Sequence, residues 1–264
     1  MIHTRTLRSH KGAVLGVRYT NDGAYCMSCG ADRRILLWNP SRPAAQTGAL
    51  LIKEYSGQHA SEVSKVAIAR DSTRFASCGG DSAAFVWNVA TGAVLKRLEG
   101  HAARINAVAF AGVDEQVLAT ASYDNTARLW DLRSQSRAAI QTLSDFKDSV
   151  TSLVVARDRA TDWAIVAASV DGCVRTYDLR RGLMNSDNLG APVTSVALSH
   201  DGGLLYGTNR VLWRLVNADI AAELDGVHTR ATSSLAWHPK AANLLAASFD
   251  GAISFWTTHG SNSD

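Results

Sequence analysis

Short runs of alternating apolar and polar residues, separated by tight turns, recur along this chain. The clearest stretch is His101 to Asp131. It contains three such runs, which are Ile105 to Phe110, Val117 to Ser122, and a last one that follows Asp124-Asn125 and ends in Trp130-Asp131. Alternation with period two is typical of half-buried strands, and Asp-Asn between two runs favours a hairpin. The stretch therefore predicts three antiparallel strands, and Ala139 to Leu143 can supply a fourth.

The same unit repeats along the chain. A His precedes the Asp of a tight turn by 22 or 23 residues in four places, which are His10 and Asp32, His59 and Asp81, His101 and Asp124, and His228 and Asp250. An aromatic residue follows the turn Asp by 6 residues in five places, which are Trp38, Trp87, Trp130, Tyr177 after Asp171, and Trp256. A sixth, compressed copy ends at Trp213. Units of about forty residues that open on Gly-His and close on Trp-Asp are typical of β-propeller blades.

The sequence thus predicts an all-β fold, a β-propeller of six four-stranded blades. The first strand, Thr4 to Arg8, has no blade before it, and no convincing fourth strand follows Trp256. We expect the first strand to pair into the last blade and so close the ring, because closure removes open sheet edges. Residues 1–257 would then form a single domain, followed by a disordered tail at 258–264.

Composition narrows the class of protein. Lys and Arg exceed Asp and Glu by only 3, and the mean hydropathy is −0.06, so charge alone does not indicate nucleic-acid binding. The basic residues are mostly Arg, which suits contacts to carboxylate or phosphate, although biased codon usage would give the same excess. No apolar run could span a bilayer and the first residues lack a signal-peptide core, so we expect a protein of the cytoplasm or nucleus.

The four cysteines favour core positions over a metal or redox site. Cys26 and Cys29 form a C-x-x-C, but residues three apart on a strand point to opposite faces. Cys29 and Cys78 stand three residues before the turn Asp, where other repeats carry Ala. We therefore expect no metal site and no cofactor.

With these marks the chain resembles WD-repeat propellers over nearly its whole length. In that family the His, a Ser or Thr four residues before the turn Asp, the Asp and the strand-three Trp form a buried hydrogen-bonded relay. The resemblance implies a complete relay in three blades, which are His10, Ser28, Asp32, Trp38; His59, Ser77, Asp81, Trp87; and His101, Thr120, Asp124, Trp130. It implies a partial relay in two others, formed by His228, Asp250 and Trp256 with Ala246 in place of the hydroxyl, and by Asp171 and Tyr177 with Ala167.

A His, Ser and Asp set also occurs in hydrolase triads. Here the set is repeated at positions expected to be internal, whereas a catalytic group is needed once and must face substrate. The sequence also lacks a glycine-rich phosphate loop and a nucleophile motif. We therefore expect no catalytic residues and no enzyme.

Several stretches are similar to the mitogen-activated protein kinase organizer family, a WD-repeat group also found in spliceosomes. They are GAYCMSCGADRRILLWNPSR, GGDSAAFVWNVATG, SVDGCVRTYDLRRG and SLAWHP. The family resembles a seven-bladed ring, so about one blade is missing between Ser199 and Arg210, near the compressed repeat. The resemblance implies a scaffold that binds several proteins, in kinase signalling, in pre-mRNA splicing, or in both.

In WD-repeat rings, the residue before the turn Asp and two alternating residues at the start of each first strand reach the rim of the narrower face. Most of the equivalent residues here are small, and these would only cap the blades. Exposed aromatics beside Arg are usual anchors of protein interfaces. We therefore predict a partner site at Tyr123, Phe249, Arg104 and Asn106, with Glu62 and Leu15 on its margin. The expected molecule is a monomeric propeller without a membrane role, and RNA contact within a larger complex is the alternative.

Overall fold

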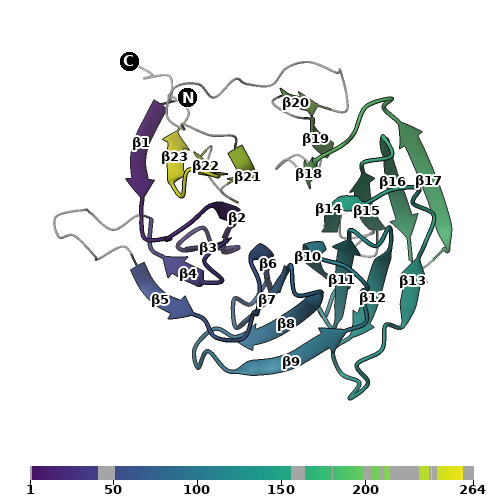
Figure 1. Ribbon diagram of the computed structural model, residues 1–264, viewed down its shortest axis with the longest axis horizontal. Coiled ribbons are helices and arrows are strands. Elements are labelled where there is room, and N and C mark those ends of the chain that lie inside the picture. Colours follow the sequence, from purple (N-terminus) through teal and green to yellow (C-terminus); the bar gives the residue numbers. More distant parts are fainter. Residues whose placement is uncertain are drawn as a thin grey trace. The chain divides into compact units, whose positions relative to one another are not determined.

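The computed structural model describes residues 2–40, 51–155, 164–179, 181–198, 204–208, 211–214, 232–237, 239 and 243–257. All regular elements in these residues are β-strands (Figure 1). The chain divides into two compact units, one formed by Met1–Val66 with Leu224–Asp264 and the other by Ala67–Glu223. The predicted tail at 258–264 lies outside the described residues.

The first unit contains two four-stranded antiparallel sheets. One has the order β2-β3-β4-β5, with β2 at Val14–Tyr19, β3 at Cys26–Gly30, β4 at Ile35–Trp38 and β5 at Leu51–Tyr55. The other has the order β1-β23-β22-β21, with β1 at Ile2–Leu7, β21 at Thr232–Trp237, β22 at Asn243–Ser248 and β23 at Ile253–Thr257. β3 is buried at every position, whereas β5 alternates, because only the outer strand has a face toward water.

The first strand of the chain is the outer strand of the sheet that contains Trp256. β1 runs antiparallel to β23, pairing His3 with Trp256 and Leu7 with Ile253, with an irregularity between His3 and Arg5. Figure 1 shows β1 alongside β23. This is the pairing that the sequence predicts between the two ends of the repeat array, and it covers the edge of β23.

The second unit holds the remaining sheets. β6 at Val63–Ile68 crosses the boundary of the two units and leads the order β6-β7-β8-β9, with β7 at Arg74–Gly79, β8 at Ala83–Asn88 and β9 at Val94–Glu99. The next order is β10-β11-β12-β13, with strands at Ile105–Ala111, Val117–Ser122, Ala127–Asp131 and Gln141–Leu143. Then comes β14-β15-β16-β17, with strands at Val150–Val155, Ala164–Ser169, Cys173–Asp178 and Leu183–Asn188.

The compressed repeat forms a sheet of three strands in its described part. Its order is β18-β19-β20, with strands at Ser195–Leu198, Leu204–Thr208 and Val211–Arg214. Its expected continuation to Leu224 lies outside the described residues. The fold is therefore the predicted all-β propeller type, built from several four-stranded antiparallel sheets.

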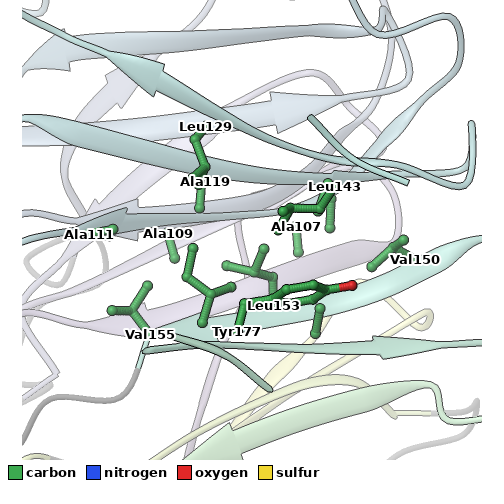
Figure 2. Close-up of a cluster of buried hydrophobic side chains, with 14 of the residues drawn as sticks. Ala107, Ala109, Ala111, Ala119, Leu129, Leu143, Val150, Leu153, Val155 and Tyr177 are labelled. Carbon is green, nitrogen blue, oxygen red and sulfur yellow. The ribbon is translucent and has the colours of Figure 1, made fainter. Parts of the chain in front are cut away.

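Small side chains on the inner strands allow neighbouring sheets to pack closely. Figure 2 shows the cluster formed between the β10–β13 and β14–β17 sheets of the second unit. Ala107, Ala109 and Ala119 face Leu153 and Tyr177 there, and all five side chains are buried. Alanine on one sheet leaves room for large residues on the other, as the close packing of a protein core requires.

Glycine serves the same purpose in the first unit. A Cβ at Gly16 on β2 would lie 2.8 Å from the Cys29 sulfur and 3.1 Å from the Ser64 carbonyl oxygen. Both distances are shorter than ordinary van der Waals contact, so only glycine lets β2 approach this closely.

Candidate functional site

The β10–β13 sheet contains a buried relay of four side chains. His101 Nδ1 lies 2.8 Å from Asp124 Oδ2, and His101 Nε2 lies 2.8 Å from Thr120 Oγ1. The Trp130 indole Nε1 donates to the same hydroxyl at 2.8 Å. The four residues come from the loop before β10, from β11, from the β11–β12 turn and from β12, and they are the set that the resemblance to WD-repeat propellers implies for this repeat.

The hydrogen bonds fix the state of the imidazole. An indole N–H can only donate, so Thr120 Oγ1 accepts from Trp130, and the Asp124 carboxylate can only accept, so its partner on the imidazole must be a donor. Nδ1 therefore carries the ring proton and donates to the Asp124 carboxylate. Burial lowers the pKa of His101, which keeps the ring neutral.

The Asp124 carboxylate is held in its charged form. Burial alone would raise its pKa, but hydrogen bonds from Thr126, His101 and the Ala102 backbone N–H outweigh that effect. The pKa of Asp124 is therefore below its usual value. A carboxylate that accepts from several donors holds the loop before β10 and the β11–β12 turn together.

The β2–β5 sheet repeats this arrangement. His10 Nδ1 lies 2.9 Å from Asp32 Oδ2, His10 Nε2 lies 2.8 Å from Ser28 Oγ, and the Trp38 indole donates to Ser28 at 2.8 Å. The Lys11 backbone N–H donates to Asp32 as the Ala102 N–H does to Asp124.

In the β6–β9 sheet the Trp87 indole donates to Ser77 Oγ at 2.8 Å, and the Ala83 N–H donates to Asp81 at 3.4 Å. His59 is buried and belongs to the first unit, whereas the other three relay residues of this repeat belong to the second.

The β14–β17 sheet uses different residues, which sequence reasoning missed. The Lys147 N–H donates to Asp171, so Phe146 occupies the place that His101 has in its own sheet. Arg175 Nη1 lies 2.9 Å from Asp171 Oδ2, and the Arg175 guanidinium lies 5.0 Å from the Phe146 ring centroid. The predicted residue Tyr177 contacts the Phe146 ring, with 6.0 Å between centroids, and donates to Asp145 at 3.1 Å.

In the last sheet only part of the predicted relay is described. Asp250 accepts from the Ala252 N–H at 2.9 Å, and its own N–H donates to Ser248 at 3.2 Å. His228 and the side chains of Trp256 and Ala246 lie outside the described residues.

The relay cannot operate as a hydrolase triad in the state that the structure shows. The His101 side chain is 0% exposed and Thr120 is 0% exposed, so no substrate can reach the hydroxyl. The Thr120 hydroxyl is also hydrogen-bonded on both sides, to the His101 imidazole and to the Trp130 indole. The geometry suits a structural role, because every polar atom of the set has a partner.

Three residues of the predicted partner site lie together on the second unit. Tyr123 is 60% exposed, and its backbone N–H donates to the Arg104 carbonyl at 3.0 Å. The Arg104 Nε donates to Asn106 Oδ1 at 3.0 Å, and the Asn106 amide donates to the Val150 carbonyl at 2.9 Å. An exposed tyrosine and an oriented arginine are thus linked through their backbones at neighbouring strand ends.

The other three predicted residues belong to the first unit. Phe249 is 40% exposed in the turn between β22 and β23. The Leu15 carbonyl accepts from Lys65 Nζ at 3.4 Å, and Glu62 accepts from the Ser61 hydroxyl at 2.5 Å. A site that unites all six residues stays a prediction.

Three of the four cysteines are core residues, and Cys173 is only partly buried. Cys26, Cys29 and Cys78 are buried thiols, and burial raises the pKa of Cys29 to about 12. No group of three or more His, Cys, Asp or Glu side chains in the described residues is placed to hold a metal ion. Over the same residues, we find no helix with the length and apolar character needed to cross a bilayer.

Repeated four-stranded antiparallel sheets, two of which hold a complete His, hydroxyl, Asp and Trp relay in the described residues, define a WD-repeat propeller. Profile comparison agrees with that class. The profile described as WD domain, G-beta repeat, matches residues 2–39 and 224–257, and the β-propeller profile described as WDR41 matches residues 52–179. WD-repeat proteins are typically non-catalytic scaffolds.

Sequence comparison identifies the group within that class. WD repeat domain-containing protein 83 of Rattus norvegicus is 36% identical over 259 residues, which cover 96% of this chain and 78% of the relative. The protein of the same name from Xenopus tropicalis is 37% identical, over 75% of this chain and 59% of the relative. Pre-mRNA-splicing factor cwf17 of Schizosaccharomyces pombe is 28% identical, over 65% of this chain and 47% of the relative. The chain thus spans about half to four fifths of the length of these relatives.

The chain therefore belongs to the WD-repeat family, in the group of WD repeat domain-containing protein 83, the mitogen-activated protein kinase organizers.

Proposed function

We propose that this protein is a non-catalytic scaffold of the cytoplasm or nucleus that holds several protein partners, with one partner site at Tyr123, Arg104 and Asn106. The observation that carries the proposal is that the exposed Tyr123 is tied through its backbone N–H to Arg104, whose own guanidinium is oriented by Asn106. Tyrosine and arginine are enriched among the residues that dominate binding energy at interfaces.

The way these side chains are held supports a binding role. An exposed aromatic contributes little to folding, yet the Tyr123 turn is fixed by the Ser122 hydroxyl, which donates to the Arg104 carbonyl at 2.8 Å. Asn106 positions Arg104 and is itself anchored to Val150. A partner would meet a surface that is already ordered, so little conformational entropy is lost on binding.

A propeller of six blades closed into one ring is the architecture that we propose for residues 1–257. The support is the pairing of β1 with β23, which joins the first and last strands of the repeat array in one sheet. In such a ring Phe249, Glu62 and Leu15 would extend the partner site, and the protein would act as a monomer.

The partner context follows from the relatives. Similarity to mitogen-activated protein kinase organizers favours components of a kinase pathway. The more distant similarity to a pre-mRNA-splicing factor favours components of the spliceosome as the second context. RNA contact through a larger complex is a third possibility, which the mild net charge of +3 does not favour.

An affinity pull-down from native extract tests the proposal. The variant Arg104→Glu, Tyr123→Ala should melt like the wild type, because both side chains are exposed, and should lose kinase-pathway or spliceosomal partners. Tyr25→Ala is the matched control, since Tyr25 is an exposed tyrosine at a different turn, and it should retain every partner. If the double variant also retains every partner, the site lies elsewhere.

Direct RNA binding would give a different result. Release of counterions from phosphates makes such binding weaken steeply between about 50 and about 200 mM salt. A salt titration with single-stranded RNA would therefore separate an RNA-contacting subunit from a protein scaffold.

A further inference from the structure

Four basic residues gather at one end of the β2–β5 sheet. Arg8 and Lys11 lie in the loop before β2, and Arg33 and Arg34 lie in the turn between β3 and β4. The two segments are tied together by Asp32, which accepts from the Lys11 N–H at 3.0 Å and from the Arg34 N–H at 3.2 Å. Arg34 Nη1 also donates to the Ser9 carbonyl at 3.1 Å.

The acidic residues at this end are already engaged. Asp32 faces inward to His10, and Glu54 accepts from Arg34 Nε at 2.7 Å. Arg8, Lys11 and Arg33 are exposed, and none of these three side chains forms an ion pair within the described part of the chain. Three exposed cations therefore remain on a loop and a turn that are fixed to each other, and we name them the basic rim.

Arg33 has a backbone conformation that is unfavourable for a residue with a long side chain. Its φ is +62°, in the left-handed region, and the equivalent residues of the other described turns are Ser82, Asn125, Gly172 and Gly251. Asn and Gly adopt this conformation at lower cost than a long side chain does. The Arg33 N–H donates to the Gly30 carbonyl, but that bond belongs to the turn and would form with any residue. A residue that opposes its local backbone without a compensating contact points to a function outside folding.

The other described blades lack such a set. The residue after the relay His, which is Lys11 here, is Ala60 and Ala102 in the next two repeats. The residue two before that His, which is Arg8 here, is Gly57 and Glu99. In the β14–β17 sheet Lys147 stands at the position of Lys11. Gly172 and Cys173, which stand at the positions of Arg33 and Arg34, carry no charge.

We propose that the basic rim of Arg8, Lys11 and Arg33 binds an acidic segment, rich in Asp and Glu, of a partner protein. The Arg34 to Glu54 contact at the same end shows that carboxylates pair with arginine there. Nucleic acid fits this surface less well. Proteins that bind nucleic acid usually contact the phosphates with more than three cations, and those that bind single strands also stack the bases on aromatic side chains. The only ring in the loop and turn is that of His10, which is buried in the relay.

Fluorescence anisotropy with a labelled peptide of alternating Glu and Ser tests the rim. At about 50 mM salt the acidic peptide should bind, and the same peptide with Gln in place of Glu should not. The variant Arg8→Gln, Lys11→Gln, Arg33→Asn should weaken binding about tenfold, since each exposed pair contributes modestly and three act together. Asn suits the left-handed backbone, so the variant should melt no lower than the wild type.

Lys147→Gln is the matched control, because Lys147 donates its backbone N–H to Asp171 as Lys11 does to Asp32, and it should change affinity less than twofold. The proposal is overturned if the acidic peptide binds no better than the Gln peptide, or if the triple variant binds it as the wild type does. If the wild type binds oligouridylate more strongly than the acidic peptide, and the triple variant loses that binding, the rim is an RNA site instead. None of these readouts involves Tyr123, so the rim and the Tyr123 site succeed or fail separately.

Discussion

Arg175 and Asp171 form a buried ion pair across the turn between β15 and β16, with 2.9 Å between Nη1 and Oδ2. Both side chains are almost fully buried. Burial alone would raise the pKa of Asp171, but the N–H groups of Lys147 and Cys173, together with Arg175, hold it below its usual value. The fourth blade thus keeps a charged centre although Phe146 replaces the relay His. The turn Asp of this sheet therefore has hydrogen-bond donors without a His or a hydroxyl.

Removing the cation should destabilise this blade strongly. Arg175→Met would leave the Asp171 carboxylate buried with fewer donors, so we expect the free energy of unfolding to fall by about 3 kcal/mol. Urea unfolding followed by tryptophan fluorescence measures the loss. Arg181→Met is the control, because Arg181 is exposed and should change stability by less than about 0.5 kcal/mol. Equal effects of the two variants would contradict a structural role for the pair.

The relay of the third blade should behave as a structural unit. Trp130 is 1% exposed and is the largest fully buried side chain among the described residues, so Trp130→Ala should cost about 3–5 kcal/mol. The separate variant Asp124→Ala should also lower the free energy of unfolding, because it leaves buried donors without an acceptor. Thermal unfolding measures both. Hydrolase turnover that disappeared in Asp124→Ala while the melting curve was retained would instead indicate catalysis.

The resemblance to WD-repeat propellers supplied the relay residues that the β2–β5 and β10–β13 sheets contain, whereas repeat spacing was sufficient to predict the three-strand unit and the pairing of the first strand. It was sufficient because hydrogen bonding between a loop and a turn demands a fixed number of residues between His101 and Asp124. Spacing could not reveal Arg175. In the third blade the same strand position holds Arg128, but there His101 already donates to Asp124. An arginine at this position therefore does not by itself indicate an ion pair with the turn Asp. The one available signal was Phe146 in the place of the His.

The rim was missed for a related reason. Arg33 is an ordinary residue in the sequence, and its conflict with the backbone emerges only from its φ of +62°. Tyr123 could be predicted as exposed because its place before the turn Asp fixes its direction. Its hydrogen-bonded support from Arg104 and Asn106 depends on tertiary contacts with Val150, which no local pattern encodes.

Stability should depend on pH through His101. The unfolded chain takes up a proton near the ordinary histidine pKa of about 6.5, whereas burial lowers the pKa in the folded protein. Between the two values the unfolded state binds more protons, so the free energy of unfolding should fall as the pH falls below about 6.5. Asp124 acts in the same direction at lower pH, because its folded pKa is also below its usual value.

Urea unfolding at about pH 7.5, 6.5 and 5.5 measures this dependence, which for one proton is at most about 1.4 kcal/mol per pH unit. His101→Gln should be less stable at pH 7.5 and should show a shallower decline. Trp130→Phe, which loses stability but keeps His101, should retain the wild-type slope. An unchanged slope in His101→Gln would exclude His101 as the source.

The pairing of β1 with β23 should be essential for the last sheet. Leu7 on β1 is 4% exposed and packs in a cluster with Leu36 and Ile253, so Leu7→Ala should cost about 2–4 kcal/mol. Deleting residues 1–9 removes these contacts and also uncovers the edge of β23, so its melting temperature should fall further and aggregation should increase. Arg8→Ala, at the exposed position after the strand, is the control and should melt within a few degrees of the wild type. A deletion variant with the wild-type melting curve would show that the sheet of β21, β22 and β23 is stable without β1, and that a ring closed by strand exchange is not needed.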